Sequence, residues 1–192
     1  RESPMWQSVT HLDPRANRLF DLVNDLRNLL DGSAVSARSY DHLTGLFSAP
    51  KRKTSKNLIL ISGLHSLYLK SLVEEIDRSF YLMMDEKLRV SFKIKRDLDR
   101  RRSSDYTLNE VKKREKDSEK YIQPQSKRAD VIFNILPVNP DDIDNKSSDE
   151  IKLKLRVIIK SCPYYSELIR ALTGLCNLHV NLNDINDIGG VD

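Results

Sequence analysis

Three continuous apolar runs of strand length, separated by segments with helical periodicity, constrain the fold of this chain most. The runs cover residues 57–61, 79–84 and 129–136. Apolar runs of this length, bounded by polar or turn-forming residues, are typical of strands that are buried on both faces of a parallel sheet. Residues 153–157 alternate apolar and basic side chains, which is typical of an edge strand with one solvated face. The pattern predicts an α/β fold with a mostly parallel sheet.

Apolar residues at helical spacing predict helices before and between these strands. The first is expected to begin at Asp13 and Pro14, an N-cap followed by proline at the first helical position, and to end at Gly32. Further helices are expected over residues 67–76, from Asp85 to about residue 101, and over residues 108–121 and 164–175. Strands that alternate with helices favour parallel connections.

The positive charge of the chain is concentrated in its middle. The whole sequence has 32 Lys and Arg against 28 Asp and Glu, a net charge of +4. Residues 86–128 alone contain fifteen Lys or Arg and eight Asp or Glu. Such a segment is compatible with an anionic ligand, although a solvated helix face with interleaved acids is the commoner explanation. No nucleic-acid-binding module accompanies the charge, so nucleic acid is the weakest of the candidate partners.

Length and cysteine content indicate the domain organisation and the compartment. At 192 residues, of which 39% are hydrophobic, the chain is long enough for one domain with its own core. No apolar run reaches the roughly 18 residues of a membrane span, and no secretory leader opens the sequence. Cys162 and Cys176 are too few for a disulfide framework, which favours a reducing, cytoplasmic compartment. Because the sequence begins without Met and stops at Asp192, shortly after the turn-like Gly189 and Gly190, we expect a piece of a longer protein.

Four stretches in order resemble the phosphoribulokinase and uridine kinase family. They are residues 40–45 (YDHLTG), 60–68 (LISGLHSLY), 93–101 (KIKRDLDRR) and 121–132 (YIQPQSKRADVI). The match covers residues 13–138 and is closer to phosphoribulokinase than to uridine kinase. The resemblance implies a P-loop-kinase-like three-layer α/β sandwich over residues 1–192, with an antiparallel edge and without its N-terminal strand and P-loop. Residues 139–192 would then form a C-terminal strand–helix–strand extension.

The resemblance also implies a reaction and the residues that carry it. Members of this family transfer the γ-phosphate of ATP, with Mg²⁺, to a hydroxyl of a sugar, a sugar phosphate or a nucleoside. Arg96 and Arg101 match the catalytic arginines of the family's lid, and Lys93 matches a basic residue of the same helix, so all three are expected to bind the nucleotide. Guanidinium groups suit this task because they hold phosphate oxygens in pairs and neutralise developing charge. Without the resemblance, a solvated helix end, where cations complement the helix dipole, would be the favoured explanation of Arg100, Arg101 and Arg102.

A second group of side chains is expected, from the resemblance, to bind the acceptor. Hydroxyl and imidazole groups can hydrogen-bond to phosphate or sugar oxygens. The loop residues Tyr40, His42 and Thr44 are explained equally well by an ordinary turn, in which Asp41 and Thr44 bond their own backbone. His65 is explained equally well as a packed, neutral histidine. The candidates are Tyr40, His42, Thr44, His65 and Tyr68.

Two departures from the family pattern bear on activity. The sequence contains no G-x-x-x-x-G-K-[ST] loop to cradle phosphates. Ser62 stands where the family usually has an acid that helps to organise Mg²⁺, so its neutral hydroxyl is the candidate metal contact. In addition, Arg102 replaces the glycine that usually follows the lid arginine.

These observations leave two hypotheses of different classes. The first is a small-molecule kinase whose phosphate loop precedes Arg1. The second is an inactive kinase-derived module that binds or scaffolds other molecules. Association with a second copy of the chain, or with other domains of a parent chain, is compatible with both hypotheses. The residues that precede Arg1 would distinguish between them.

Overall fold

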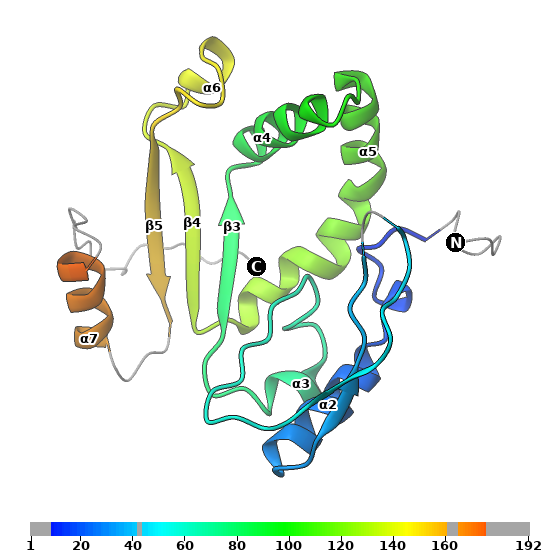
Figure 1. The fold of residues 1–192 in the computed structure, drawn as a ribbon. Coiled ribbons are helices and arrows are strands. Elements are labelled where there is room, and N and C mark those ends of the chain that lie inside the picture. Colours follow the sequence, from blue (N-terminus) through cyan, green and yellow to red (C-terminus); the bar gives the residue numbers. More distant parts are fainter. Residues whose placement is uncertain (1–8, 42–43, 161–164, 176–192) are drawn as a thin grey trace.

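The main sheet of the protein contains three strands (Figure 1). The computed structural model describes residues 9–41, 44–160 and 165–175. Strand β3 (Phe80–Met84) pairs in parallel with β4 (Val131–Pro137), and β4 pairs antiparallel with β5 (Leu153–Ile159). Two of the continuous apolar runs thus form the parallel pair, and the alternating run forms the antiparallel edge. The predicted α/β fold with a mixed sheet is confirmed.

The prediction of a central strand over residues 57–61 is wrong. Leu58 and Leu60 are 84% and 86% exposed, whereas Ile59 and Ile61 pack against buried residues of the first long helix. One side of this extended segment is therefore buried. A strand also needs backbone hydrogen bonds to a neighbouring strand, and none of the described strands pairs with this segment.

The N-terminal helix begins later than the sequence predicts. Asp13 does act as a cap, because its side chain accepts a hydrogen bond of 2.8 Å from the backbone N–H of Arg15. It caps only a 3₁₀ turn, η1 (Pro14–Ala16), since Asn17 has an extended backbone that interrupts the helix. Helix α2 (Leu19–Leu30) follows, and Gly32 ends it with a φ of +81°, a conformation that favours glycine.

The helix expected over residues 67–76 is a single turn, α3 (Lys70–Val73). Leu67 and Leu72 are both buried, but they belong to two different core clusters. Leu72 packs with α2, whereas Leu67 packs with Ile132 of β4. A regular helix over this segment would place its apolar side chains on one face. The backbone is instead extended at Leu69, which allows Leu67 and Leu72 to pack into different clusters.

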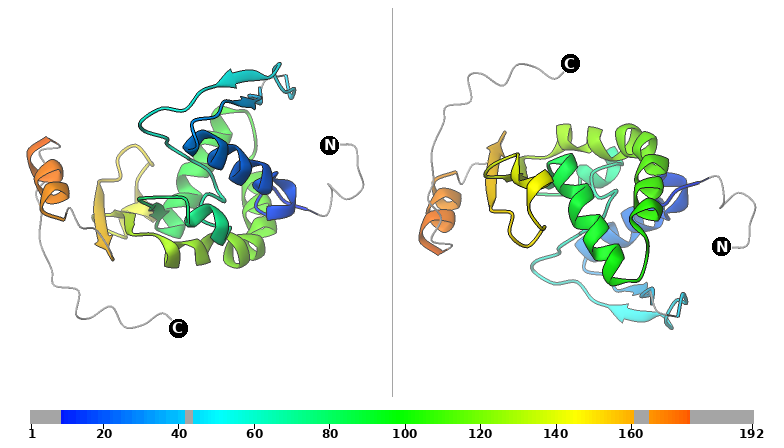
Figure 2. Two further views of the ribbon diagram at one scale, coloured as in Figure 1. Left: turned by 90° about the horizontal axis from the view of Figure 1, so that it is seen from below. Right: turned by 90° about the horizontal axis from the view of Figure 1, so that it is seen from above.

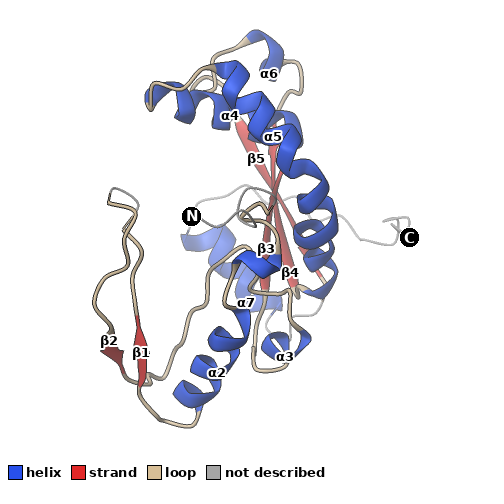
Figure 3. Ribbon diagram, turned by 90° about the vertical axis from the view of Figure 1, so that its right-hand side faces the viewer, coloured by secondary structure: helices blue, strands red, loops and turns tan. Residues whose placement is uncertain are grey.

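Two longer helices follow β3 and form a hairpin beyond its carboxyl end (Figure 3). Asp85 caps α4 (Glu86–Asp99) as predicted, because its side chain accepts a hydrogen bond of 3.1 Å from the backbone N–H of Leu88. A short turn that contains Arg101, with a φ of +59°, leads to α5 (Ser104–Asp117). The sequence therefore located the first helix of the hairpin well.

Helical structure continues through Pro124, beyond the end at residue 121 that the sequence predicts for the second charged helix. A π-helical turn, η2 (Ser118–Ile122), continues α5, and a 3₁₀ helix, η3 (Gln123–Arg128), leads into β4. Proline is tolerated here because it lies in the first turn of η3, where its missing N–H has no helical partner to lose.

The remaining elements lie at the sides of this body. β1 (Val35–Ala37) and β2 (Lys51–Lys53) form an antiparallel hairpin, which extends away from the main sheet on the side of α2 (Figure 2). α6 (Asp142–Asn145) is one turn between β4 and β5. α7 (Tyr165–Arg170) and the π-helical turn η4 (Ala171–Leu175) form the expected C-terminal helix.

The strand expected near residues 178–180 lies outside the described residues. No helix in the described ranges is both long enough and apolar enough to span a membrane.

Candidate functional site

A cavity of about 470 Å³ lies between the N-terminal segment, the carboxyl end of β3 and the α4–α5 hairpin. We call it the basic cavity, because four of the side chains that line it are cations and a histidine joins them. These residues are His11, Arg89, Lys93, Arg96 and Arg114. Apolar side chains, among them Leu64 and Met84, line the rest of the wall together with the carboxylate of Glu115. The carboxyl end of parallel strands is where open α/β sheets usually bind ligands.

Helix α4 supplies three of the cations through its periodicity. Arg89, Lys93 and Arg96 are four and then three residues apart, which places them on one face of the helix. Arg114 faces them from α5. The sequence analysis singled out Lys93 and Arg96 but not the other two. Arg89 could have been found from its spacing to Lys93, whereas nothing local distinguishes Arg114 from the other basic residues of α5.

Lys93 is the half-buried cation of this group that forms no ion pair with another described residue. Burial lowers the pKa of its ammonium group, and the charge of Arg114 lowers this pKa further. Arg89 and Arg114 have intrahelical partners in Glu86 and Glu110. Asp97 and Glu110 act in the opposite direction but form no ion pair with Lys93. A half-buried cation that is repelled by a neighbouring cation and has no ion pair within the described residues indicates a place where an anionic group binds favourably.

Arg96 is held only weakly in its present position. One of its terminal nitrogens lies 3.6 Å from a carboxylate oxygen of Asp97, and 58% of its side chain is exposed. That separation is longer than a hydrogen bond, so little is lost when the guanidinium group turns towards a ligand. Arg101 is exposed in the turn after α4 and does not line the basic cavity. Its role as a lid arginine stays a prediction.

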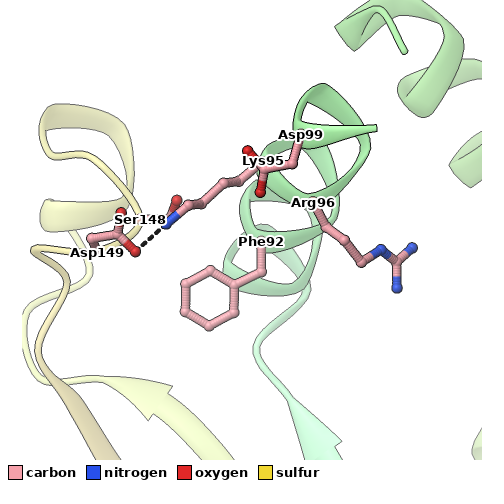
Figure 4. Close-up of a pocket in the computed structure, with 6 residues that line it drawn as sticks. All are labelled: Phe92, Lys95, Arg96, Asp99, Ser148 and Asp149. Carbon is pink, nitrogen blue, oxygen red and sulfur yellow. Dashed lines mark hydrogen bonds and ion pairs between the residues drawn. The ribbon is translucent and has the colours of Figure 1, made fainter. Parts of the chain in front are cut away.

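A second, smaller cavity of about 270 Å³ shares Phe92 and Arg96 with the basic cavity. Figure 4 shows the residues that line it, which include Ser148 and Asp149. Lys95 points across it to Asp149, with which it forms an ion pair, while the guanidinium group of Arg96 points away from that pair. Because Lys95 is already paired with Asp149, this cavity is less suited to bind an anionic ligand than the basic cavity.

His65 follows Leu64, a residue of the cavity wall. Its ring is only 4% exposed and lies near the backbone of His11, yet neither ring nitrogen has hydrogen-bond geometry to any described residue. Burial lowers the pKa of the imidazole. Tyr68 packs edge-on against it, with 5.8 Å between ring centroids. The ring is thus a packed histidine with unused hydrogen-bonding capacity, and an acceptor-binding role for His65 and Tyr68 stays a prediction.

The other candidate acceptor residues lie on the β1–β2 hairpin. Tyr40 forms an isolated bridge with Phe47, and their rings are 5.2 Å apart. The Thr44 hydroxyl donates a hydrogen bond of 2.9 Å to Asp41, as expected for an ordinary turn. Neither Tyr40 nor Thr44 lines the basic cavity, and His42 lies outside the described residues. The structure therefore does not bring this loop together with the cations of α4.

Ser62 does not form a magnesium site with its neighbours. It is exposed, and the described part of the chain contains no group of three or more His, Cys, Asp or Glu residues that could hold a metal ion. Mg²⁺ prefers carboxylate and phosphate oxygens, so a single neutral hydroxyl does not fit it.

An α/β fold with a cation-lined cavity at the carboxyl end of its parallel strands defines a class of proteins that bind phosphorylated ligands. Comparison with known proteins narrows the class. The model of the phosphoribulokinase / uridine kinase family matches residues 1–141. The chain belongs to this family.

Individual relatives agree with the family assignment. The chain is 32% identical over 156 residues to a phosphoribulokinase of Synechocystis sp., covering 81% of this chain and 46% of that protein. It is 32% identical over 157 residues to a chloroplastic phosphoribulokinase of Spinacia oleracea, covering 80% of this chain and 38% of that protein. The chain thus spans less than half the length of these curated relatives.

A solved structure supports the fold. The phosphoribulokinase from Rhodobacter spheroides superposes with a TM-score of 0.64 at 20% sequence identity, and the match covers 86% of this chain and 64% of that one. This likeness extends the confirmed α/β assignment to the fold of a phosphoribulokinase.

Proposed function

We propose that this chain takes part in ATP-dependent transfer of a phosphoryl group to a hydroxyl of a sugar phosphate. Phosphorylated ribulose is the first acceptor to test, because the relatives are named phosphoribulokinases. The observation that carries the proposal is the convergence of Arg89, Lys93, Arg96 and Arg114 on one cavity. A sugar phosphate and a nucleoside triphosphate together bring more negative charge than any single cation could neutralise.

The residues of the cavity would act by positioning and by electrostatics. Lys93 would bind a phosphate oxygen directly, since it has no ion pair with another described residue to give up. Arg96 would leave Asp97 and place its planar guanidinium group on two oxygens of the transferred group. Leu64 and Met84 would exclude water from the same space, which strengthens these contacts. Phosphoryl transfer needs little more from a protein than such an arrangement and a base.

ATP and Mg²⁺ are part of the proposal as general requirements of the family. A G-x-x-x-x-G-K-[ST] loop is absent from the 192 residues, so this sequence alone does not supply the usual cradle for the nucleotide phosphates. The comparisons give no support to the alternative of an inactive binding module. Association with a second copy or with other domains is left as a proposal, as is a cytoplasmic location, which rests on the two cysteines.

The test measures ADP release with a panel of pentose phosphates that includes ribulose phosphate. We run it on the 192-residue chain and on the longest natural form of the protein. The longest form should phosphorylate one of the sugars, whereas the 192-residue chain should bind ATP weakly and turn over nothing. Turnover by the 192-residue chain alone would show that the nucleotide phosphates are held by other residues than we propose.

Paired variants separate the cavity from general charge effects. Lys93→Met should reduce kcat/KM by about 10²- to 10³-fold, the scale for removing one well-placed charged donor. Lys112→Met removes an equal charge from the exposed face of α5 and should change the rate less than about twofold. Equal rates in the two variants, or no phosphorylation of any sugar phosphate by any form, would refute the proposal.

A further inference from the structure

His11 lines the basic cavity, and contacts of its neighbours Thr10 and Asp13 hold its backbone in place. The Thr10 hydroxyl donates a hydrogen bond of 2.7 Å to Asp117 at the end of α5. The same hydroxyl accepts a hydrogen bond of 3.1 Å from the backbone N–H of Leu12. The buried carboxylate of Asp13 pairs with Arg15 at 2.7 Å. The backbone of His11 is therefore fixed against α5, while its side chain is exposed and open to a ligand.

The groups that face His11 are predominantly cationic. From α4, Lys93 lies close enough to act on its charge, with Arg89 and Arg96 lining the same cavity. From α5, Arg114 and the carboxylates of Glu110 and Glu115 face it, and His65 faces it from the loop after residue 61. Glu110 is already paired with Arg114, so the surroundings of His11 carry an excess of positive charge.

Partial burial lowers the pKa of the His11 imidazole, and the charges of Arg114 and Lys93 lower it further. In the free cavity a smaller fraction of the rings is thus charged than in an isolated histidine at the same pH. An anion that binds between His11, Lys93 and Arg114 offsets the charges of the two cations. It thereby removes their lowering effect on the pKa of the His11 imidazole. The same anion also attracts a proton to the ring directly.

We propose that His11, Lys93 and Arg114 together bind one tetrahedral dianionic group, and that His11 takes up a proton when this group binds. The inference deepens the proposed function and rests on it for the identity of the ligand, which would be a phosphate of the sugar phosphate or of the nucleotide. His11 would then make binding stronger at lower pH. Nothing in the local sequence around His11 indicates such a role, since it depends on α4 and α5.

The size of the effect follows from proton linkage. Above the pKa of the bound state, the ring is neutral in both states and contributes no extra binding. As the pH falls through that pKa, the affinity rises, and it stops rising below the pKa of the free state, where the ring is charged in both. Each unit by which the anion raises the pKa adds at most about tenfold in affinity.

The first experiment measures sulfate binding to the 192-residue chain by calorimetry at about pH 6 and about pH 8. Sulfate is a suitable probe because it stays a dianion over this whole range, so a change in affinity reports the protein. We expect roughly three- to tenfold tighter binding at the lower pH, given the ordinary histidine pKa. Two buffers of different ionisation enthalpy should give different binding heats at the lower pH, which reports proton uptake.

The decisive variant is His11→Gln, which keeps a polar side chain of similar reach but cannot titrate. It should bind sulfate at both pH values with the affinity that the unaltered chain has at the higher pH, and with no proton uptake. His11→Asn serves as a second variant should the first not fold, as judged by circular dichroism. Lys113→Gln, on the exposed face of α5, should leave both the affinity and its pH dependence unchanged. If both histidine variants retain the proton uptake of the unaltered chain, the inference is wrong.

The same titration separates this inference from the proposed function. It needs no ATP, so loss of proton uptake in His11→Gln supports the role of His11 even if no sugar phosphate is ever phosphorylated. Repeating the titration with a pentose phosphate and with ATP distinguishes the two sources of the phosphate group. For one of these ligands, the affinity should depend on pH in the unaltered chain and lose that dependence in His11→Gln. Sulfate binding that is equally strong in Lys93→Met would overturn the three-residue site whatever the enzyme does.

Discussion

Thr107 and Asp97 are joined by a hydrogen bond of 3.1 Å where α5 turns back on α4, and both side chains are buried, with exposures of 0% and 2%. This contact ties the helix that carries Lys93 and Arg96 to the helix that carries Arg114. The other carboxylate oxygen of Asp97 has no hydrogen-bond partner among the described residues, with Arg96 and Arg102 at 3.6 and 3.9 Å. The basic cavity thus depends on one buried carboxylate with a single hydrogen bond from a side chain.

Replacement of Thr107 by valine should destabilise the α4–α5 hairpin. The change keeps the shape of the side chain but leaves the buried carboxylate of Asp97 without its hydroxyl donor, which costs about 1–3 kcal/mol. Urea denaturation measures this loss. Thr54→Val, at an exposed position outside regular structure, should change the free energy of unfolding by less than about 0.5 kcal/mol. Equal stabilities of the two variants would contradict the role of the buried pair.

Two substitutions at Arg101 separate the side chain from the backbone. In the longest natural form of the protein, Arg101→Ala should lower kcat by about 10²- to 10³-fold and raise KM less, if the guanidinium group acts as charge develops. Arg101→Gly should lower kcat equally, since it also lacks the side chain. It should be more stable than Arg101→Ala by up to about 1 kcal/mol, because glycine tolerates the φ of +59°. An unchanged kcat in both variants would remove Arg101 from the site.

Stability should fall as the pH drops below the ordinary histidine pKa of about 6.5. Burial lowers the pKa of His65, so below that value the unfolded chain binds more protons than the folded one. Comparing urea midpoints at about pH 7.5 and 5.5 should show this loss. His65→Gln should reduce the difference between the two midpoints. His11 contributes in the same direction, so the double variant should be nearly flat. A pH dependence that His65→Gln leaves unchanged would show that other groups cause it.

Gln125 is a buried link between η3 and the cavity wall. Its amide nitrogen donates hydrogen bonds of 2.8 Å to the carbonyls of Leu64 and Tyr121, and its oxygen accepts one of 3.0 Å from the N–H of Leu67. Gln125→Leu should cost at least about 2 kcal/mol, because these groups lose their partners inside the protein. Hydrogen exchange at Leu67 should become faster. Gln123→Leu, exposed on the same helix, should leave both measurements unchanged.

The elements predicted correctly from the sequence are those specified by their own residues. Strands β3, β4 and β5 and helix α4 carry their periodicity and caps locally, as Asp85 illustrates. Residues 57–61 failed because an apolar run reports that a segment is partly buried, not that a neighbouring strand is present to pair with it. The start of α2 was predicted wrongly because the cap at Asp13 specifies only a turn. Asn17, whose side-chain amide donates hydrogen bonds to the carbonyls of His11 and Asp13, has an extended backbone that interrupts the helix.

The candidate site could be predicted only in part. Lys93 and Arg96 were found because they lie in one motif on one helix. Arg114 was missed because its helix is rich in interleaved charges, among them its own i,i+4 partner Glu110, and cannot be told from a solvated surface helix by sequence. His11 was missed because it has no neighbour in the sequence with which it acts. Arg114 and His11 reach the basic cavity only because α5 packs against the segment around His11. No local sequence pattern predicts that contact.

The hydrogen bond between Thr10 and Asp117 joins residues 107 positions apart. Closing so long a loop is entropically unfavourable until the intervening elements have formed, so this contact is expected late in folding. During synthesis at roughly 5–20 residues per second, the N-terminal segment would wait roughly 5–20 seconds for α5 to emerge. His11 is therefore made well before α5, and a nascent chain would acquire affinity for anions at the basic cavity only after α5 has emerged and packed.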